Sequence, residues 1–384
     1  MTKSTILLTG ATGALGSEVL PRLLAKGHRV FCLARGKDGR SPQERIDRIT
    51  GGSTAAVAIE GDVCLPRCGI RDMDRSIMQG LVSRLVHGAA SISFEKEEIT
   101  YLTNVEGVKN ALEVAEVLGV HDFNHISTAY IAGNARSFSE NDLQRGQSLP
   151  NAYAHTKLTG ETMVRTWALA NPQRSFTVFR PSILVGREDG TTSDFNTYYG
   201  YMYPYYMNAE AVRRRVAAGK QLPNDISVNH DGVVHTPLVV RMSNESTLNL
   251  VTVDWVADML SELLDIPSAN KTYHLAHPKP TRVREVLDIS LARLRVEGVR
   301  VVNTDIDELS ARKRQSRLLA VLQERMDKIH LQYLPYVTAE PEFSMQNAHE
   351  ALNGRYRDPP TIDKKLIHTL LDFAVERQWK SNGR

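Results

Sequence analysis

The sequence has few cysteines and no long apolar run. Its 384 residues include three cysteines, Cys32, Cys64 and Cys68, which excludes a disulfide-rich scaffold and fits a reducing compartment. No stretch reaches the roughly 18 apolar residues that a membrane-spanning helix needs. An apolar strand pattern begins almost at the first residue, which leaves no room for a signal peptide. These absences predict a cytoplasmic protein with no stable membrane span.

An excess of charge is also missing. The formal net charge of +3 is too small to indicate a nucleic-acid partner or a membrane surface. Cys64 and Cys68 lie four residues apart around Pro66, but no second Cys or His pair is nearby, so we predict no metal site. Internal repeats and low-complexity linkers are absent. The length fits a large α/β domain, or a nucleotide-binding domain with a smaller partner.

A glycine-rich stretch stands at the start of the chain. The apolar run 6–8 leads into Thr9, Gly10, Ala11, Thr12, Gly13, Ala14, Leu15 and Gly16, and an apolar helical pattern follows to residue 25. We expect Gly10 to allow the tight turn, Gly13 to let the backbone approach a pyrophosphate, and Gly16 to let the helix pack on the strand. The helix N-terminus would point its N–H groups at the phosphates. This pattern predicts a dinucleotide site.

The end of the second expected strand, at residues 29–35, indicates which dinucleotide binds. An NAD enzyme carries a carboxylate there for the ribose 2′-hydroxyl, whereas this chain has Arg35, followed by Lys37 and Arg40. Arginine binds a 2′-phosphate bidentately and stacks on adenine. A solvated basic loop is the alternative. We predict NADP(H) as the cofactor.

Further positions along the expected parallel sheet face the same ligand. A third strand at 57–63 ends with Asp62 and Val63, where Asp62 would accept from the adenine amino group. A fourth runs through His87 into the small residues Gly88, Ala89 and Ala90, and Asn104 opens a helix. Strands that alternate with helices predict a doubly wound parallel sheet of the Rossmann type, with its ligand at the carboxyl ends of the strands.

The predicted chemistry lies in Tyr153-Ala154-His155-Thr156-Lys157. Residues four apart share a helix face, so Lys157 would stand beside Tyr153 and lower its pKa toward the working range. Lys157 would also hold the nicotinamide ribose. A fifth strand at 123–126 ends in Ser127 and Thr128, and either hydroxyl can bind a developing oxyanion. Tyr153, Lys157, Thr128 and Ser127 are the predicted catalytic residues.

These motifs together resemble the extended short-chain dehydrogenase/reductase superfamily. Further segments are similar to its fatty acyl-CoA reductase and thioester-reductase branch: HGAASISF (87–94), NVEGVKNALEVA (104–115), HISTAYIAG (125–133), YAHTKLTGE (153–161), FRPSILVG (179–186) and LVTVDWVADML (250–260). The tail matches only through LQYLPYVTAEPEFSMQN (331–347).

The resemblance implies roles for individual residues. Tyr153 would be the proton donor, Lys157 its electrostatic partner and Thr128 the oxyanion hydroxyl, with Ser127 as the alternative. Arg180, Pro181 and Ser182 would border the nicotinamide. The implied reaction is NADPH-dependent reduction of an acyl thioester to an aldehyde, and possible further reduction to an alcohol. The acyl group would arrive on coenzyme A or on a separate acyl or peptidyl carrier protein.

The remaining residues are assigned to substrate binding. We predict that residues 1–190, together with 248–280, form the nucleotide-binding domain, and that 191–247 and 281–384 form a smaller, mainly helical substrate region. Segment 194–207 is rich in Tyr and Met, which suits an apolar acyl pocket or ordinary core packing. Arg213, Arg214 and Arg215 would meet phosphates or an acidic carrier, or form a solvated helix face.

Two other functions use the same core. One is an epimerase or dehydrogenase of this superfamily that acts on a nucleotide sugar or a secondary alcohol. Ala129 follows Thr128 where sugar dehydratases usually need an acidic residue, which disfavours that reaction. The other is a non-catalytic NADP(H)-sensing protein. Such proteins tend to lose the Tyr or the Lys, and both are present here.

Overall fold

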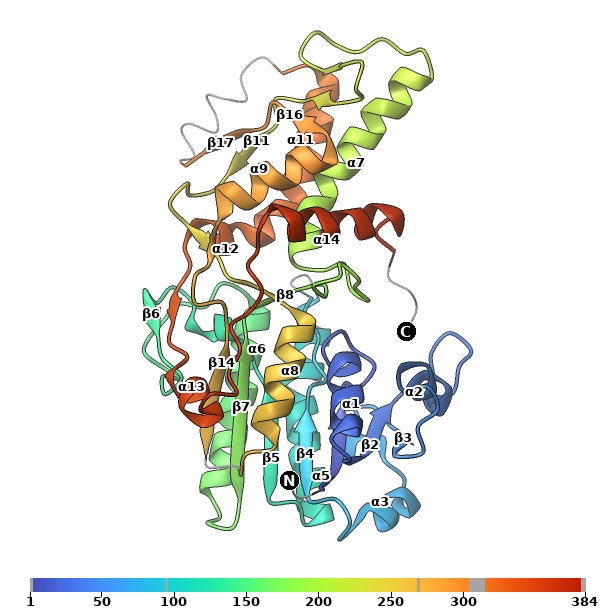
Figure 1. The fold of residues 1–384 in the computed structure, drawn as a ribbon, viewed down its shortest axis with the longest axis vertical. Coiled ribbons are helices and arrows are strands. Elements are labelled where there is room, and N and C mark those ends of the chain that lie inside the picture. Colours follow the sequence, from blue (N-terminus) through green and yellow to red (C-terminus); the bar gives the residue numbers. More distant parts are fainter. Residues whose placement is uncertain (1–2, 94–95, 268–269, 304–314, 381–384) are drawn as a thin grey trace.

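A sheet of seven parallel strands forms the lower half of the molecule (Figure 1). The computed structural model describes residues 3–93, 96–267, 270–303 and 315–380. The strands lie in the order β14-β7-β5-β4-β1-β2-β3. Their bounds are β1 Thr5–Thr9, β2 Arg29–Ala34, β3 Ala56–Glu60, β4 Arg84–His87, β5 Asp122–Ile126, β7 Ser175–Pro181 and β14 Lys271–Leu275. The order reverses between β1 and β4, where a doubly wound sheet binds its ligand.

Helices cover both faces because the strands are apolar on both sides. In β1, Ile6 and Leu8 join one core cluster and Leu7 joins another, as the two-residue period of a strand requires. The first cluster includes side chains of α1 (Gly16–Ala25), α2 (Pro42–Thr50) and α8 (Val253–Leu264). The second includes those of α3 (Asp72–Met78), α5 (Gly107–Leu118) and α6 (Ala152–Leu169). The predicted doubly wound fold is confirmed.

The helix expected to open at Asn104 begins earlier. α4 (Glu97–Tyr101) continues through the π-helical turn η2 (Leu102–Glu106) into α5. Asn104 lies inside this turn, and its side chain accepts from Ser91 N at 2.8 Å and donates to Ser91 O at 2.9 Å. The amide therefore fixes the loop after β4. The prediction that Asn104 starts the helix is wrong, because helical turns run without a break from Glu97 to Leu118.

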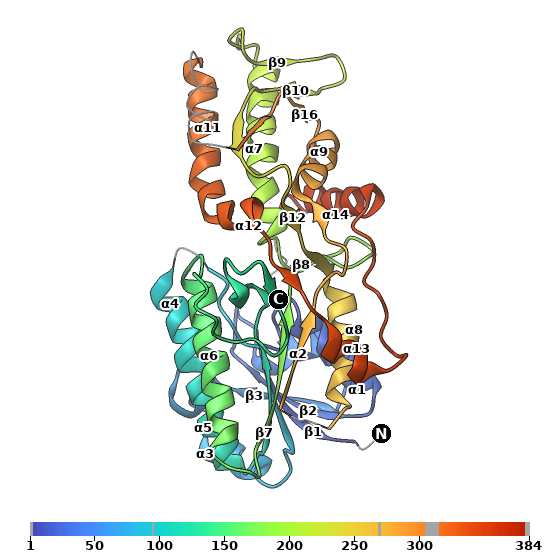
Figure 2. The same cartoon turned by 90° about the vertical axis from the view of Figure 1, so that its left-hand side faces the viewer.

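The upper part of the molecule is smaller and mainly helical (Figures 1 and 2). We call the described residues of 191–247, 281–338 and 359–380 the cap. Its helices are α7 Tyr198–Ala217, α9 Val283–Leu294, α11 Arg317–His330, η4 Leu331–Tyr333, α12 Leu334–Thr338 and α14 Lys364–Glu376. Short strands complete it: β9 Ser227–Val228, β10 Val234–His235, β11 Val239–Arg241, β16 Val296–Glu297 and β17 Arg300–Val302. One apolar cluster fills its interior.

Side-chain caps set two of the cap helices. A helix is expected over residues 306–329, of which 306–314 lie outside the described residues. α11 begins at Arg317 because the Ser316 hydroxyl accepts from Leu319 N at 3.2 Å. In the same way Asp363 caps α14 and accepts from Leu366 N at 2.8 Å. The last helix packs on α9, and its Leu370 and Leu371 belong to the apolar cluster that fills the cap.

Two short strand pairs connect the cap to the sheet. β8 (Ile183–Val185) pairs with β13 (Leu250–Thr252) in parallel. β12 (Thr247–Leu248) pairs with β15 (Thr281–Arg282) in antiparallel orientation. The chain therefore passes between the two parts at several places, and the cap is held over the carboxyl edge of the sheet.

One stretch departs from the predicted domain division. Residues 339–358, which we call the strap, leave the cap and run back along the sheet (Figure 1). β18 (Glu342–Phe343) pairs with β6 (Ser137–Phe138), and α13 (Gln346–Leu352) packs on α8 and β14. The prediction that all of 281–384 belongs to the substrate region is wrong here. The buried Ala348 and Leu352 join the core of the sheet, through elements too short to show in a sequence pattern.

Candidate active site

A cavity of about 710 Å³ lies between the carboxyl edge of the sheet and the cap. Its wall at the sheet end includes Gly10, Thr12, Gly13, Ala14, Leu15, Gly16, Lys37, Gly88 and Ala90. Its middle includes Ser127, Thr128, Tyr153, Lys157, Pro181 and Ser182. Fifteen of the predicted site residues therefore line one continuous space, with the glycine stretch at one end and the Tyr–Lys pair further in.

The glycines of the loop after β1 are required by close backbone contacts. Gly10 has φ +76°, and a Cβ on it would lie 2.6 Å from Ala89 N. A Cβ on Gly16 would overlap Gly10 O. The loop thus presents backbone rather than side chains to the cavity, next to the first turn of α1. This arrangement fits the phosphates of a dinucleotide.

Thr9 and His87 lie behind the cavity wall. Thr9 Oγ1 is 2.9 Å from His87 Nδ1 and accepts from Gly88 N and Ala89 N at 3.2 Å each. The hydroxyl therefore holds the end of β4 against the end of β1. The His87 ring stacks on the His125 ring, with 5.7 Å between the ring centroids. Burial, and then the Lys157 ammonium, lower the pKa of His87 to about 3, so its ring is neutral.

At the expected ribose end, Arg35 and Asp62 form an ion pair of 2.9 Å. Burial alone would raise the pKa of Asp62, but the hydrogen bond from Cys64 N and the Arg35 guanidinium lower it below its usual value. Arg40 forms a turn with Lys37 through two backbone hydrogen bonds of 3.0 Å. Lys37 lines the cavity, whereas Arg35, Arg40, Asp62 and Val63 do not. Val63 is buried, and its carbonyl accepts from Asn110 Nδ2 at 2.8 Å.

Arg45 is a site residue that the sequence analysis missed. Its guanidinium donates to Thr12 Oγ1 at 2.9 Å and to Arg35 O at 2.6 Å. It therefore bridges the glycine loop and the end of β2, beside the expected 2′-phosphate position. Burial, and then the positive charge of Arg35, lower its pKa. Its place one turn after the helix-capping Ser41, behind a basic loop, is the signal that could have identified it.

The four predicted catalytic residues come together. α6 starts after Asn151, whose side chain accepts from Ala154 N at 3.0 Å, and this places Tyr153 and Lys157 on one helix face. Thr128 hydrogen-bonds to Tyr153, and its oxygen accepts from Tyr130 N at 3.2 Å. Lys157 Nζ donates to the carbonyl of Ile126.

Burial dominates the protonation of this group. It raises the pKa of Tyr153, as does the nearby Tyr336 phenol, while the bond from Thr128 opposes them. Burial also lowers the pKa of Lys157 to about 8, against the influence of Glu161. The expectation that Lys157 lowers the Tyr153 pKa is wrong for this structure. Ser127 lines the cavity, and among the described residues its Oγ is one of the buried side-chain atoms without a hydrogen-bond partner.

Arg180 does not reach the cavity. Its side chain is fully buried and pairs with Glu161 at 2.7 Å, and it donates to Asp142 O at 2.7 Å. Successive side chains of a strand point to opposite faces, so Pro181 faces the cavity and Arg180 faces α6. The expectation that Arg180 borders the nicotinamide does not agree with this placement.

The cap supplies the far wall of the cavity. Its lining residues come from α7, α9 and the tail: Tyr198, Tyr201, Met202, Val283, Val286, Leu287, Tyr333, Tyr336, Val337, Phe373 and Arg377. Segment 194–207 contributes to the cavity wall and to the core of the cap. Tyr198, Tyr201 and Met202 line the cavity, whereas Tyr199 and Tyr205 are core residues that do not reach it.

The tail adds two phenol contacts beside the catalytic residues. The Tyr336 hydroxyl accepts from Asn151 Nδ2 at 2.9 Å, and its ring packs edge-on against Tyr130 at 5.1 Å. Tyr130 donates to Glu340 of the strap at 2.6 Å. Both tyrosines line the cavity. The sequence offered no local signal for Tyr336, because it joins the site only through folding of the tail.

The three successive arginines of α7 lie away from the cavity. Arg213 pairs with Glu210 at 2.7 Å and donates to the carbonyls of Gly232 and Leu294 at 3.1 Å each. Arg215 donates to Gln221 O at 3.0 Å. These contacts support a role in holding the end of α7 to the adjoining loops of the cap.

The described residues contain no group of three or more His, Cys, Asp or Glu side chains placed to hold a metal ion. Cys64 precedes the short turn η1 (Pro66–Gly69), and Cys68 lies within it and is buried. Across the parts of the chain that the structure describes, no helix is long and apolar enough to cross a membrane.

Comparison with known proteins identifies the family of the chain. The family model described as male sterility protein matches residues 8–260. Human fatty acyl-CoA reductase 1 is 25% identical over 303 residues, which cover 66% of this chain and 53% of that protein. Peramine synthetase A of Epichloe festucae (strain Fl1) is 26% identical over 265 residues, 65% of this chain and 9% of that protein. The chain thus spans about half the length of the first relative and a small part of the second.

Solved structures show the same fold. The terminal R domain from the myxalamid PKS-NRPS biosynthetic pathway superposes with a TM-score of 0.74 at 23% identity, over 100% of this chain and 93% of that one. A thiolation-reductase di-domain from an archaeal non-ribosomal peptide synthetase gives 0.70 at 17% identity, over 99% and 76%. The chain belongs to the family described as male sterility protein, whose model is that of an NAD-binding domain.

Proposed function

We propose that this protein reduces acyl thioesters to aldehydes with NADPH. The observation that carries the proposal is the continuous cavity, which joins the glycine loop, the Thr128–Tyr153–Lys157 group and an apolar wall from the cap. The reductase names of the relatives support it. The acyl group would arrive on coenzyme A or on a carrier protein, with its chain against α7 and α9.

The preference for the phosphorylated dinucleotide rests on the basic residues around the end of β2. Lys37 lines the cavity, and Arg45 is fixed between the glycine loop and Arg35. Arg35 directly follows β2, and Arg40 closes the next turn with Lys37. Guanidinium groups bind phosphate bidentately, so a 2′-phosphate would find several partners there.

The chain's own residues would handle the charge and the proton. When bound, the reduced nicotinamide supplies the hydride to the thioester carbon. Thr128 is oriented because its oxygen accepts from Tyr130 N, so its O–H can face the developing oxyanion together with the Tyr153 phenol. Tyr153 donates its proton to that oxygen and forms a hemithioacetal. The C–S bond then breaks, which gives the aldehyde and a free thiol. Lys157, which lies on the same helix face as Tyr153, would hold the ribose hydroxyls.

The decisive experiment incubates the protein with NADPH and a panel of acyl-CoA and acyl-carrier thioesters. We expect NADPH consumption that depends on the thioester and releases one thiol for each aldehyde formed. The Tyr153→Phe variant serves as the inactive control. Turnover of a nucleotide sugar or a secondary alcohol without thiol release would replace this proposal with the epimerase or dehydrogenase function. NADPH binding without turnover of any substrate would favour a sensing protein.

A further inference from the structure

A carboxylate stands in the wall of the cavity beside the glycine loop. Glu18 lies in the first turn of α1, two residues after Gly16, and both line the cavity. Its side chain is 14% exposed. A carboxylate at a helix N-terminus interacts favourably with the helix dipole, but it repels any phosphate that binds to the same turn. The Glu18 carboxylate therefore occupies the turn at which the phosphates of a dinucleotide would bind.

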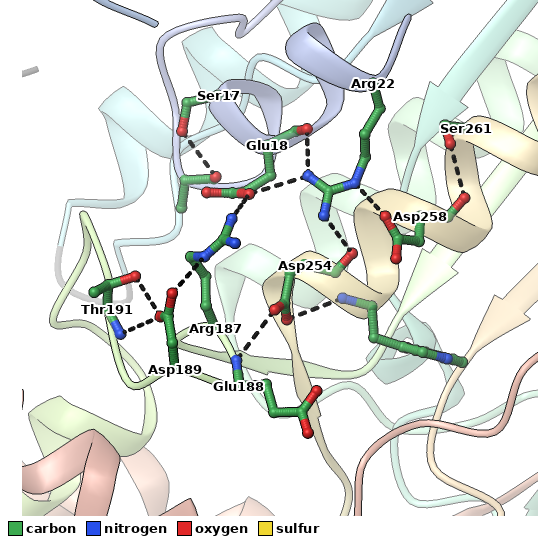
Figure 3. A network of polar contacts seen from close by, with 12 residues as sticks. Ser17, Glu18, Arg22, Arg187, Glu188, Asp189, Thr191, Asp254, Asp258 and Ser261 are labelled. Atoms are coloured by element: carbon green, nitrogen blue, oxygen red, sulfur yellow. Dashed lines mark hydrogen bonds and ion pairs between the residues drawn. The ribbon is translucent and has the colours of Figure 1, made fainter. Parts of the chain in front are cut away.

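Two arginines neutralise this carboxylate (Figure 3). Arg187 Nη1 lies 2.5 Å from Glu18 Oε2, and Arg22 Nη1 lies 3.1 Å from the same oxygen. Arg22 is anchored elsewhere, because it also binds Asp258 and the carbonyl of Asp254. Arg187 is the one of the two that lines the cavity, with 37% of its side chain exposed.

The loop that presents Arg187 has a fixed backbone. Arg187 N donates to Thr191 O and Gly190 N donates to Arg187 O, each at 2.8 Å. Glu188 N donates to Asp254 Oδ2 at 3.1 Å, which joins the loop to the start of α8 (Figure 3). The backbone therefore stays in place, while the long guanidinium side chain of Arg187 can change partner by rotation alone.

The same loop touches the cap. Gly190 has φ +87°, and a Cβ on it would lie 2.6 Å from Thr369 O in α14. A Cβ on Gly186 would lie 2.7 Å from the hydroxyl of Tyr199 in α7. The Arg187 loop is thus pressed between the first turn of α1 and the two helices that shape the substrate end of the cavity.

We propose that Arg187 is a pyrophosphate-binding residue that Glu18 holds in place until the dinucleotide arrives. On binding, the guanidinium exchanges one carboxylate oxygen for phosphate oxygens, which accept two parallel hydrogen bonds from it. Glu18 keeps Arg22 as its partner, so it is not left buried and unpaired. The inference rests on the dinucleotide cofactor of the proposed function and is independent of the thioester substrate.

The test measures dissociation constants of two ligands by calorimetry, without any substrate. NADPH contains the pyrophosphate, whereas adenosine 2′-monophosphate contains the adenine end and lacks it. Arg187→Gln should raise the dissociation constant of NADPH by about tenfold to a hundredfold, the range for a lost hydrogen bond to a charged group. The dissociation constant of adenosine 2′-monophosphate should not change. Arg187→Lys should recover part of the loss because it keeps the charge.

The opposite sign is expected at Glu18. Glu18→Gln removes the negative charge that pairs with Arg187 and repels the phosphates, so NADPH should bind several-fold more tightly. Glu188→Gln is the matched control: it removes the same charge from an exposed neighbour of Arg187 that does not line the cavity, and it should change nothing. Melting temperatures of all variants check that each one folds.

Three results would overturn the inference: weaker NADPH binding in Glu18→Gln, an equal loss of both ligands in Arg187→Gln, or no NADPH binding by the unmodified chain. The proposed thioester reduction fails separately. If no thioester yields thiol while the affinity pattern appears as expected, Arg187 keeps its role and only the substrate assignment falls.

Discussion

At the sheet end of the cavity the wall is largely backbone, whereas at the cap end it is made of large apolar side chains. Gly10 and Gly16 can carry no side chain without overlap, and the polar groups around them are held by hydrogen bonds. Tyr198, Val286 and Leu287 at the other end come from separate helices packed in one apolar cluster. A backbone wall fixes one ligand shape, while a wall of side chains can change size by substitution. The two ends are thus suited to a constant cofactor and to a variable substrate.

The largest expected effect lies where the two ends meet. Tyr153→Phe keeps the ring but cannot donate a proton, so turnover should fall by about two to four orders of magnitude. The dissociation constant of NADPH should hardly change, because in the proposed function the hydroxyl contacts the substrate oxygen. Turnover is followed by NADPH absorbance and binding by fluorescence. Tyr101→Phe, at a half-exposed position of α4, is the control. Near-normal turnover of Tyr153→Phe would show that another group is the acid.

The second prediction concerns the sheet end alone. If Arg35 and its neighbours hold the 2′-phosphate, NADPH should bind more tightly than NADH by about 2–3 kcal/mol, the scale of charge-assisted hydrogen bonds. Arg35→Asp should reverse that order and leave the acyl preference unchanged. Arg48→Asp makes the same charge change at an exposed position of α2 and should keep the preference. Equal affinity of both cofactors for the unmodified chain would contradict the assignment.

The third prediction concerns the cap end alone. Val286→Phe adds volume to the apolar wall, where overpacking disturbs binding by about 1–3 kcal/mol. The KM of long acyl thioesters should rise about tenfold, and that of short ones should change little. Ile289→Phe makes a similar change on α9 at a residue that does not line the cavity. An altered NADPH affinity in Val286→Phe would show that the two ends are not separable.

The smallest expected effect is a pH dependence at the boundary. Because burial lowers the pKa of Lys157 to about 8, the ammonium is present below that pH and lost above it. The affinity for NADPH should therefore fall a few-fold as the pH rises through about 8. The 2′-phosphate, whose second pKa is about 6, does not titrate in that range. Lys157→Arg stays charged, and its affinity curve should be flat. A slope that persists in Lys157→Arg would assign the titration to another group.

The sequence identified the sheet end because its residues are neighbours in the chain. The glycine loop lies within one strand–turn–helix unit, and Tyr153 and Lys157 share one helix turn, so spacing alone places them. The residues of the cap wall could not be predicted from spacing in the sequence, since α9, α12 and α14 meet only through tertiary packing. Tyr336 lies 183 positions after Tyr153 in the chain, and no local pattern connects them.

Two polar residues were misjudged for a different reason. Arg180 lies in β7 and pairs with Glu161 of α6. A sequence does not show which face of a strand will meet a buried carboxylate. The pKa of Tyr153 depends on burial by the cap and on Tyr336, neither of which spacing reveals. Charges and protonation therefore required the folded environment, while backbone motifs did not.

The strap has a consequence for exchanging caps between relatives. Glu340 accepts hydrogen bonds from Tyr130 Oη at 2.6 Å, Asn249 N at 2.7 Å and Thr247 Oγ1 at 3.0 Å. The carboxylate of Glu340 thus joins the loop after β5 to β12 and to the residue before β13. A chimera that replaced it with an apolar residue would leave buried donors without an acceptor, at about 1–3 kcal/mol for each. An exchange of caps on this sheet should therefore retain the strap, so that the Glu340 carboxylate keeps its three donors.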